Sequence, residues 1–251
     1  MSRLPSEHEL SPYVPGFPPG RRWLFLAPHA DDEVFGPGAT LAQAGRRGVE
    51  VTLVVVTDGA AQGSTAVREG EARAAARELG LPEPRFWRLA DRSLDPVDRR
   101  LQAKLADALA ETGPEVVFVT SPVELHPDHR ALALALQRTL RRWSLLGGRR
   151  RQPAWVAAYE VGTVLRPNLL VDAGPGWEAK RRAGACYASQ LEFRGYDAAM
   201  EALGTWRCLT LQGCERAEAF CLLPVRRVVR RSARSWAAGM GSPEGVVRVR
   251  G

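Results

Sequence analysis

Two short segments of the sequence carry an unusual density of titratable side chains: PHADDE at 28–33 and ELHPDHR at 124–130. The residues in them that could do chemistry together are His29, Asp31, Asp32, His126 and His129. Imidazole nitrogens and carboxylate oxygens are ligands that zinc accepts, and the same groups can take up or deliver protons. The two segments therefore point to metal-assisted chemistry.

A catalytic zinc ion is typically held by three protein ligands in a roughly tetrahedral arrangement, with one position left open. His29 and Asp32 are three residues apart, so both side chains can face one point on a turn that enters a helix. His129 can supply a third ligand from the second segment. We predict one Zn2+ ion bound by His29, Asp32 and His129, with other divalent metals as alternatives.

Asp31 and His126 are left free by this ligand set. We expect Asp31 to act as a general base on the water that the metal activates. His126 is placed to donate a hydrogen bond to an oxyanion or to protonate a leaving nitrogen. A structural alternative is that Asp31 or Asp32 caps a helix, with Glu33 placed favourably against the helix dipole. Capping explains one acid but not the whole constellation.

Short runs rich in β-branched and aromatic residues recur along the chain and predict strands. They are RWLFLA (22–27), VEVTLVVVT (49–57), RFWRL (85–89), EVVFVT (115–120), AWVAAYE (154–160) and NLLVDA (168–173). Helical segments such as 66–80 and 95–113 lie between them, each closed by a glycine. This alternation predicts an α/β fold, a Rossmann-like three-layer α/β/α sandwich with a mostly parallel sheet. Both titratable segments follow strands, at the edge where such sheets bind ligands.

The domain organisation follows from length and local composition. With 251 residues, 45% of them hydrophobic, the chain fits one large domain, which we expect to span residues 22–224. Residues 1–21 are rich in proline and predict an N-terminal extension that lies over the domain. Residues 225–251 gain arginine and glycine, and we expect them to form a basic C-terminal tail.

The net charge of +7 comes largely from arginine clusters at 141–151 and 226–234. Such clusters can hold phosphate or an anionic membrane surface, but they are at least as often solvated faces. We expect no nucleic-acid partner, and we leave open a peripheral membrane contact through the basic tail, as well as the oligomeric state. No run of about 18 apolar residues predicts a membrane span, and residues 1–20 lack the apolar core of a signal peptide, so we expect a cytoplasmic location.

Several motifs occur in a fixed order along the chain. They are PHADDE, TDG at 57–59, the RxxE of Arg68 and Glu71, HPDH at 126–129 and KRRAGACYASQ at 180–190. Together they resemble the LmbE/PIG-L family of zinc-dependent N-deacetylases over roughly residues 22–192. The family usually has proline where Ala30 stands and a Gly-Gly pair where this chain has Gly36, Pro37 and Gly38. Neither departure removes a predicted ligand.

The resemblance implies the metal ligands and the general base named above. It also implies that Asp128 orients a histidine from outside the ligand shell and that Arg68 contacts the substrate. For Arg68, an ion pair with Glu71 on one helix face is the competing interpretation.

The function that we expect is zinc-dependent removal of an N-acetyl group from an N-acetylglucosamine-type sugar, small or lipid-linked, in a glycoconjugate or its precursor. One alternative is hydrolysis of another amide or an ester. The other is a sugar- or polyanion-binding protein whose metal is structural and which has no hydrolase activity. A structural zinc site normally has four protein ligands, whereas this chain offers three obvious ones.

Overall fold

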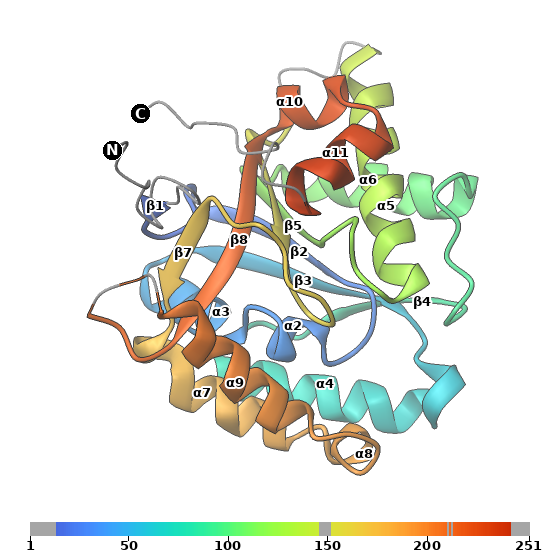
Figure 1. The fold of residues 1–251 in the computed structure, drawn as a ribbon. Coiled ribbons are helices and arrows are strands. Elements are labelled where there is room, and N and C mark those ends of the chain that lie inside the picture. Colours follow the sequence, from blue (N-terminus) through green and yellow to red (C-terminus); the bar gives the residue numbers. More distant parts are fainter. Residues whose placement is uncertain (1–13, 146–151, 210, 212, 242–251) are drawn as a thin grey trace, which may run out of the picture.

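The computed structural model describes residues 14–145, 152–209, 211 and 213–241. Its strands are β1 (Val14–Pro15), β2 (Arg22–Ala27), β3 (Glu50–Thr57), β4 (Arg85–Leu89), β5 (Val116–Thr120), β6 (Trp155–Tyr159), β7 (Leu169–Asp172) and β8 (Ala217–Pro224). Over these described ranges the eight strands form one sheet in the order β1-β7-β8-β6-β5-β2-β3-β4 (Figure 1). All six predicted strands are present, each within one residue of the predicted ends.

Helices cover both faces of the sheet. They are α2 (Asp32–Phe35), α3 (Gly38–Arg46), α4 (Thr65–Leu79), α5 (Arg99–Thr112), α6 (Pro127–Leu145), α7 (Gly174–Ala185), α8 (Ala188–Leu191), α9 (Tyr196–Arg207), α10 (Val225–Arg230) and α11 (Ala233–Gly241), with a 3-10 turn at Ala60–Gln62. Helices α2, α3, α4, α7 and α9 pack on one face, and α5, α6, α10 and α11 pack on the other (Figure 1). The predicted three-layer α/β/α sandwich is confirmed.

The central strands read as continuous apolar runs because both of their faces are buried, whereas the edge strand β4 is only partly buried. In β2, Trp23 and Phe25 belong to the hydrophobic cluster under α3 and α4, whereas Leu24 and Leu26 belong to the cluster under α5 and α6. All four side chains are at most 1% exposed. This double burial anchors β2 in the middle of the molecule and fixes the position of the loop that follows it.

The strand order places the end of β2 at a switch in chain direction. β2 pairs in parallel with β3 on one side and with β5 on the other. The chain runs outward from β2 through β3 to β4 and then returns to β5, so the loops after β2 and β5 leave the sheet on opposite faces. In open α/β sheets, ligands bind in the crevice that such diverging loops create.

The last strand, β8, was not among the predicted strands, and it changes the sheet from parallel to mixed. It inserts between β6 and β7 and pairs antiparallel with both. The sheet is therefore mostly parallel, with one antiparallel strand near the edge that lies away from the β2–β5 switch.

The prediction of a basic tail from residue 225 is wrong for residues 225–241. These residues form α10 and α11, in which Val228 and Trp236 are fully buried against the α5–α6 layer. Gln137 on α6 also donates a hydrogen bond of 2.9 Å to the Val228 carbonyl. The apolar residues recur at helical spacing, but the many arginines between them obscured that pattern. Residues after 241 lie outside the described part, and membrane contact through this segment stays a prediction.

The predicted N-terminal extension is described only from residue 14 onward. Val14 and Pro15 pair in parallel with β7 at the sheet edge. Phe17 stacks near Trp23, with 5.4 Å between the ring centroids, and the Trp23 indole N–H donates to the Pro19 carbonyl at 2.9 Å. This part of the extension therefore contacts the core. Among the helices described here, none has the length and apolar character needed to cross a membrane.

Candidate active site

The loop after β2 is held by a hydrogen bond from β3 and by another within the loop. The hydroxyl of Thr57, at the end of β3, donates a hydrogen bond of 2.8 Å to the Pro28 carbonyl. Within the loop, Oδ2 of Asp32 accepts the main-chain N–H of His29 at 2.8 Å. Asp32 therefore shapes the turn and at the same time aims a carboxylate oxygen at the space beside His29.

The loop after β5 brings the second pair of histidines to the same place. Helix α6 begins at Pro127, so Asp128 and His129 lie in its first turn. The Thr120 hydroxyl, at the end of β5, donates to the His129 carbonyl at 3.0 Å. The prediction that two distant segments meet at one sheet edge is confirmed, since the rings of His29 and His126 lie 4.6 Å apart.

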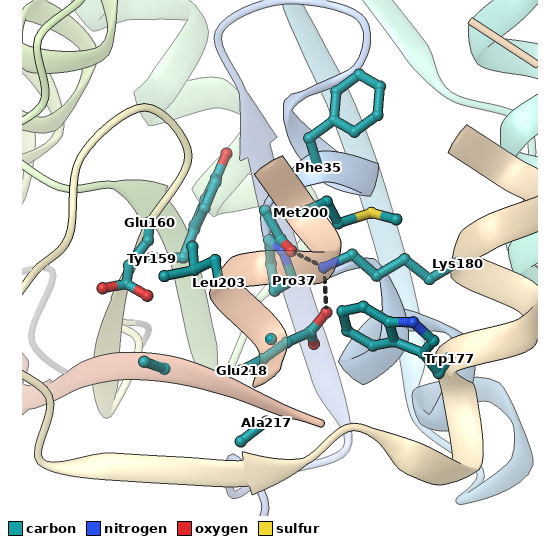
Figure 2. A pocket seen from close by; sticks show the side chains of 13 residues that line it. Phe35, Pro37, Tyr159, Glu160, Trp177, Lys180, Met200, Leu203, Ala217 and Glu218 are labelled. Carbon is teal, nitrogen blue, oxygen red and sulfur yellow. Dashed lines mark hydrogen bonds and ion pairs between the residues drawn. The ribbon is translucent and has the colours of Figure 1, made fainter. Parts of the chain in front are cut away.

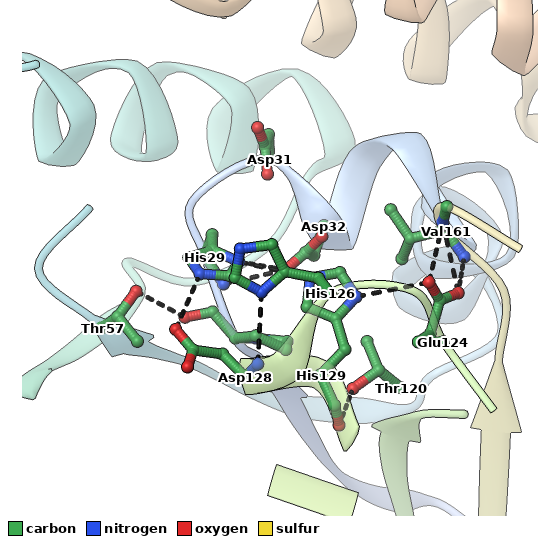
Figure 3. A network of polar contacts seen from close by, with 12 residues as sticks. His29, Asp31, Asp32, Thr57, Thr120, Glu124, His126, Asp128, His129 and Val161 are labelled. Carbon is green, nitrogen blue, oxygen red and sulfur yellow. Dashed lines mark hydrogen bonds and ion pairs between the residues drawn. The ribbon is translucent and has the colours of Figure 1, made fainter. Parts of the chain in front are cut away.

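Three donor atoms form a nearly equilateral triangle at this edge (Figure 3). Nδ1 of His29 lies 3.2 Å from Nε2 of His129, and each of these nitrogens lies within 3.3 Å of Oδ2 of Asp32. A tetrahedral zinc site with bonds of about 2.0–2.1 Å places its ligands about 3.3–3.4 Å apart. The donor set and its dimensions therefore fit a zinc ion.

The outer nitrogen of His29 is engaged by two carboxylates. Nε2 lies 3.0 Å from Oδ1 of Asp91 and 3.3 Å from Oδ2 of Asp128. Asp128 also accepts the main-chain N–H groups of Arg92 and Leu94, at 2.7 and 3.1 Å. Carboxylates in this position orient a metal-binding imidazole and direct its other nitrogen to the metal. Sequence reasoning found Asp128 but missed Asp91, which lies in the loop after β4.

Glu124 is a second residue that sequence reasoning left without a role. It is fully buried, and its carboxylate accepts main-chain N–H groups from residues 161–163, the shortest of them from Val161 at 2.8 Å. Its Oε2 lies 3.6 Å from Nδ1 of His129. Glu124 thus joins the loop after β6 to the histidine-bearing loop. The sequence feature that could have identified Glu124 is its position within ELHPDHR, just before the two histidines.

Asp31 points away from the triangle, toward α4, and is drawn above the imidazole groups in Figure 3. Its φ angle is 134°, a region that costs a non-glycine residue about 1–3 kcal/mol. Within the described residues its side chain makes no capping bond to α2; instead Oδ2 accepts a hydrogen bond of 3.2 Å from Nη2 of Arg68. Helix capping therefore does not explain Asp31.

The two adjacent aspartates have opposite electrostatic environments. Burial, reinforced by the negative charge of Asp32, raises the pKa of Asp31 to about 6, although Arg68 opposes this. Burial also disfavours the charged form of Asp32, but the His129 and His29 imidazoles outweigh it and hold its pKa well below the usual 3.8. Asp32 is thus a permanent anion suited to bind a cation, while Asp31 is suited to exchange a proton near neutral pH.

His126 is half-buried beside the two predicted histidine ligands. Its Nδ1 accepts the main-chain N–H of Asp128 at 3.2 Å, which assigns the ring proton of the neutral form to Nε2. Burial, with the nearby charges of His29 and His129, lowers the pKa of His126 below 6.5. At neutral pH it is therefore a neutral imidazole with one N–H available to donate.

Most of these groups border one pocket of about 500 Å³. The side chains that line it include His29, Asp31, Asp32, Arg68, Asp91, Arg92, Glu124, His126, His129, Gln190, Arg194 and Tyr196. Arg68 is only 4% exposed, and Nη2 also donates to the Ala30 carbonyl. Its Nε and Nη1 have no hydrogen-bond partner among the described residues, and Nη1 lies 4.0 Å from Glu71. Contact between Arg68 and a substrate stays a prediction.

Comparison with known proteins finds a family model that matches the part of the chain containing this site. Residues 24–140 match the PIG-L family model, described as GlcNAc-PI de-N-acetylase. The predicted resemblance to the LmbE/PIG-L deacetylases is confirmed. The PIG-L segment runs from β2 into α6, so it contains every residue of the donor triangle and both carboxylates that contact His29.

Proteins named as deacetylases are similar to this chain over different shares of its length. A diacetylchitobiose deacetylase of Thermococcus kodakarensis is 27% identical over 191 aligned positions, covering 68% of this chain and 70% of the relative. A 1D-myo-inositol 2-acetamido-2-deoxy-alpha-D-glucopyranoside deacetylase of Mycolicibacterium vanbaalenii is 33% identical over 144 positions, covering 43% of this chain and only 50% of that relative. The solved N,N'-diacetylchitobiose deacetylase of Pyrococcus horikoshii superposes with a TM-score of 0.71 at 25% identity, covering 82% of this chain and 85% of that one.

Residues beyond the PIG-L segment hold its ligand loop in place. Nζ of Lys180, on α7, donates to the Gly36 carbonyl at 2.5 Å and to Oε1 of Glu218 at 2.7 Å (Figure 2). Glu218 in turn accepts the main-chain N–H groups of Ala39 and Thr40 at the start of α3. A Cβ atom at Gly36 would lie 2.7 Å from the Asp32 carbonyl oxygen, so this junction requires glycine. The buried ion pair of Lys180 and Glu218 therefore fixes the point where the ligand loop leads into α3.

Proposed function

We propose that this chain is a zinc-dependent N-deacetylase that hydrolyses the acetamido group of an N-acetylglucosamine-type sugar. The observation that carries the proposal is the triangle of His29, Asp32 and His129, with edges of 3.2 to 3.3 Å, on the wall of a pocket that also contains Asp31 and His126. Three donors facing a pocket suit a catalytic metal, whereas a structural zinc has four protein ligands. The relatives named as deacetylases of diacetylchitobiose and of a 2-acetamido-2-deoxyglucoside of inositol support the substrate class.

Zn2+ held by this triangle would supply a Lewis acid that polarises the amide carbonyl and makes a water molecule more acidic. The protein itself orients the metal ligands, first through the two carboxylates that contact Nε2 of His29. Asp91 and Asp128 hold the imidazole so that Nδ1 faces the other two donors. The donor set is thus arranged before any substrate arrives.

Asp31 is the general base in this proposal. A carboxylate with a pKa near 6 is mostly ionised at neutral pH, yet it remains basic enough to accept a proton from the attacking water. Arg68 holds one oxygen of the carboxylate, which leaves the other oxygen to accept the proton. The proton taken from water balances the one that the departing amine requires.

His126 stabilises the oxygen of the tetrahedral intermediate. Its Nε2–H is free to donate because Nδ1 is occupied by the main-chain N–H of Asp128. Charge that develops on the amide oxygen would be met by this donor. A neutral imidazole performs this role without repelling a nearby cation, which agrees with the lowered pKa of His126.

The test is a metal-loaded sample incubated with a panel of N-acetylglucosamine compounds: N,N'-diacetylchitobiose and inositol-linked, nucleotide-linked and lipid-linked forms. We expect equal amounts of acetate and free amine from at least one of them, and loss of both products after chelation. Release of acetate from esters alone would indicate a different hydrolase. Tight sugar binding with no product from any compound would favour a binding protein with a structural metal.

A further inference from the structure

The segment Tyr187–Gln190 (YASQ) lies far from the ligand loops in sequence but contacts the surroundings of Asp31. Tyr187 follows α7 after one intervening residue, and Ala188–Gln190 form most of the short helix α8. Tyr187 is fully buried, and Gln190 is 2% exposed while lining the candidate active-site pocket. None of the roles assigned so far uses this segment.

One connection runs from Tyr187 to the main chain of Asp31. The Tyr187 hydroxyl donates to Oε1 of Glu33, which is itself fully buried. The other oxygen of the same carboxylate accepts the main-chain N–H of Asp31 at 3.1 Å. Because the φ angle of Asp31 is 134°, its backbone keeps this conformation only if its surroundings hold it there. Glu33, oriented by Tyr187, is a group that does so.

A second connection runs from Ser189 to the side chain of Asp31. The main-chain N–H and the hydroxyl of Ser189 donate to the two oxygens of Glu71, at 2.9 and 2.7 Å. Glu71 pairs with Arg68 at 4.0 Å, and Arg68 donates to Oδ2 of Asp31 at 3.2 Å. The Arg68 guanidinium also lies 5.8 Å from the centroid of the Tyr187 ring.

We propose that Tyr187 and Ser189 are positioning residues for Asp31: Tyr187 fixes its main chain through Glu33, and Ser189 fixes its carboxylate through Glu71 and Arg68. This inference rests on the proposed role of Asp31 as general base. A general base must lie within hydrogen-bond reach of its proton, so a small displacement lowers kcat far more than it changes substrate binding. Neither connection includes a residue of the ligand triangle, so substitutions in them should leave zinc binding unchanged.

Tyr187→Phe is the sharpest variant because it deletes one hydroxyl and keeps the aromatic ring. With N,N'-diacetylchitobiose as the probe, or whichever compound of the panel is hydrolysed, we expect kcat to fall about 10-fold while KM and zinc content change less than about 2-fold. Tyr159→Phe is the matched control. It removes another fully buried hydroxyl, which donates to the Leu26 carbonyl at 2.8 Å, and kcat should stay within about 2-fold of the parent.

A double-mutant cycle separates positioning from general loosening of the fold. If Tyr187 acts through Asp31, then adding Tyr187→Phe to Asp31→Asn should lower kcat no further, because the displaced group is already absent. A full additional 10-fold loss in that background would overturn the inference, as would an equal loss of kcat in Tyr159→Phe.

A crystal structure of Tyr187→Phe gives a readout that does not depend on activity. We expect the Asp31 main chain or its contact with Arg68 to rearrange, and an unchanged Asp31 conformation would contradict the inference. If the parent protein hydrolyses none of the panel compounds, or if Asp31→Asn keeps full activity, the proposed function fails instead. The crystal structure still decides whether Tyr187 positions Asp31 in that case.

Discussion

The Nδ1 atom of His29 lies 3.2 Å from the Nε2 atom of His129, although 100 positions separate the two residues in the sequence. Hydrogen bonding between the adjacent strands β2 and β5 brings them together, since each histidine follows the end of one of these strands. The donor triangle is therefore a product of the sheet rather than of the metal. Its arrangement should survive metal removal, because the sheet holds both strand ends in place.

Substitution of any one triangle residue should remove the metal but spare the fold. In His29→Ala, Asp32→Ala and His129→Ala we expect zinc content to drop well below one ion per chain, because two donors remain where three are needed. The far-ultraviolet circular dichroism spectrum should be unchanged, since the loops lie above a packed sheet. Asp107→Ala, an exposed acid on α5, is the control and should keep its zinc. Stoichiometric zinc in all three variants would rule out this ligand set.

Loss of the Glu124 charge should weaken the metal site indirectly. Glu124→Gln keeps the size of the side chain, but an amide cannot accept the several N–H groups of residues 161–163 as a carboxylate does. We expect zinc affinity, measured by competition with a chelator, to fall about 10-fold to 100-fold, as is typical for groups that support metal ligands. An affinity equal to that of the parent would show that Glu124 serves only the loop after β6.

Removal of the buried indole on α11 should destabilise the whole domain. Trp236 is fully buried, and replacing such a residue with alanine typically lowers the free energy of unfolding by about 3–5 kcal/mol. Urea denaturation of Trp236→Ala measures this, with the exposed Arg234→Ala as a control that should change little. If Trp236→Ala unfolds at the same urea concentration as the parent, α11 contributes nothing to the core.

Stability should depend on pH through Glu201 on α9. Its carboxylate accepts hydrogen bonds from Trp177 on α7 and from Arg216 just before β8, and it pairs with Arg181. The bond from Arg181 outweighs burial and lowers the pKa of Glu201 from 4.5 to about 2. A depressed folded-state pKa stabilises the protein above pH 4.5, and this stabilisation is lost as the pH falls toward 2.

Glu201→Gln should therefore be less stable than the parent at pH 7, and the difference in urea midpoint should shrink as the pH approaches 2. Glu192→Gln, an exposed glutamate, is the control and should match the parent at both pH values. A difference for Glu201→Gln that does not vary between pH 7 and pH 2 would mean that the carboxylate charge is irrelevant.

Much of the fold and the centre of the site could be predicted from local pattern. Six of the eight described strands were visible because they are short, rich in apolar residues and bounded by turn residues. His29, Asp32 and His129 could be associated because parallel strands bring their carboxyl ends to one edge. Both inferences depend on local features of the sequence: the apolar runs themselves, and histidines that follow the end of a strand.

The residues and the helix that could not be predicted from the sequence depend on contacts that only the three-dimensional fold creates. Asp91 and Glu33 lie beside His29 and Asp31 through hydrogen bonds that no spacing rule predicts. α11 was missed because arginines near Trp236 dominate the local composition, although that side chain packs under α5 and α6. Composition describes the exposed surface of such a helix and says little about its buried side.

Zinc titration of Asp31→Asn and Asp32→Asn tests most directly whether Asp31 is the general base and Asp32 a metal ligand. The kcat of each variant is measured on the same samples. We expect Asp31→Asn to bind zinc as the parent does while kcat falls about 100-fold or more, the usual contribution of a general base. Asp32→Asn should lose zinc affinity, because a neutral amide replaces the anionic ligand. If Asp31→Asn loses zinc while Asp32→Asn retains it and loses only turnover, the two roles are reversed and the proposed mechanism is wrong.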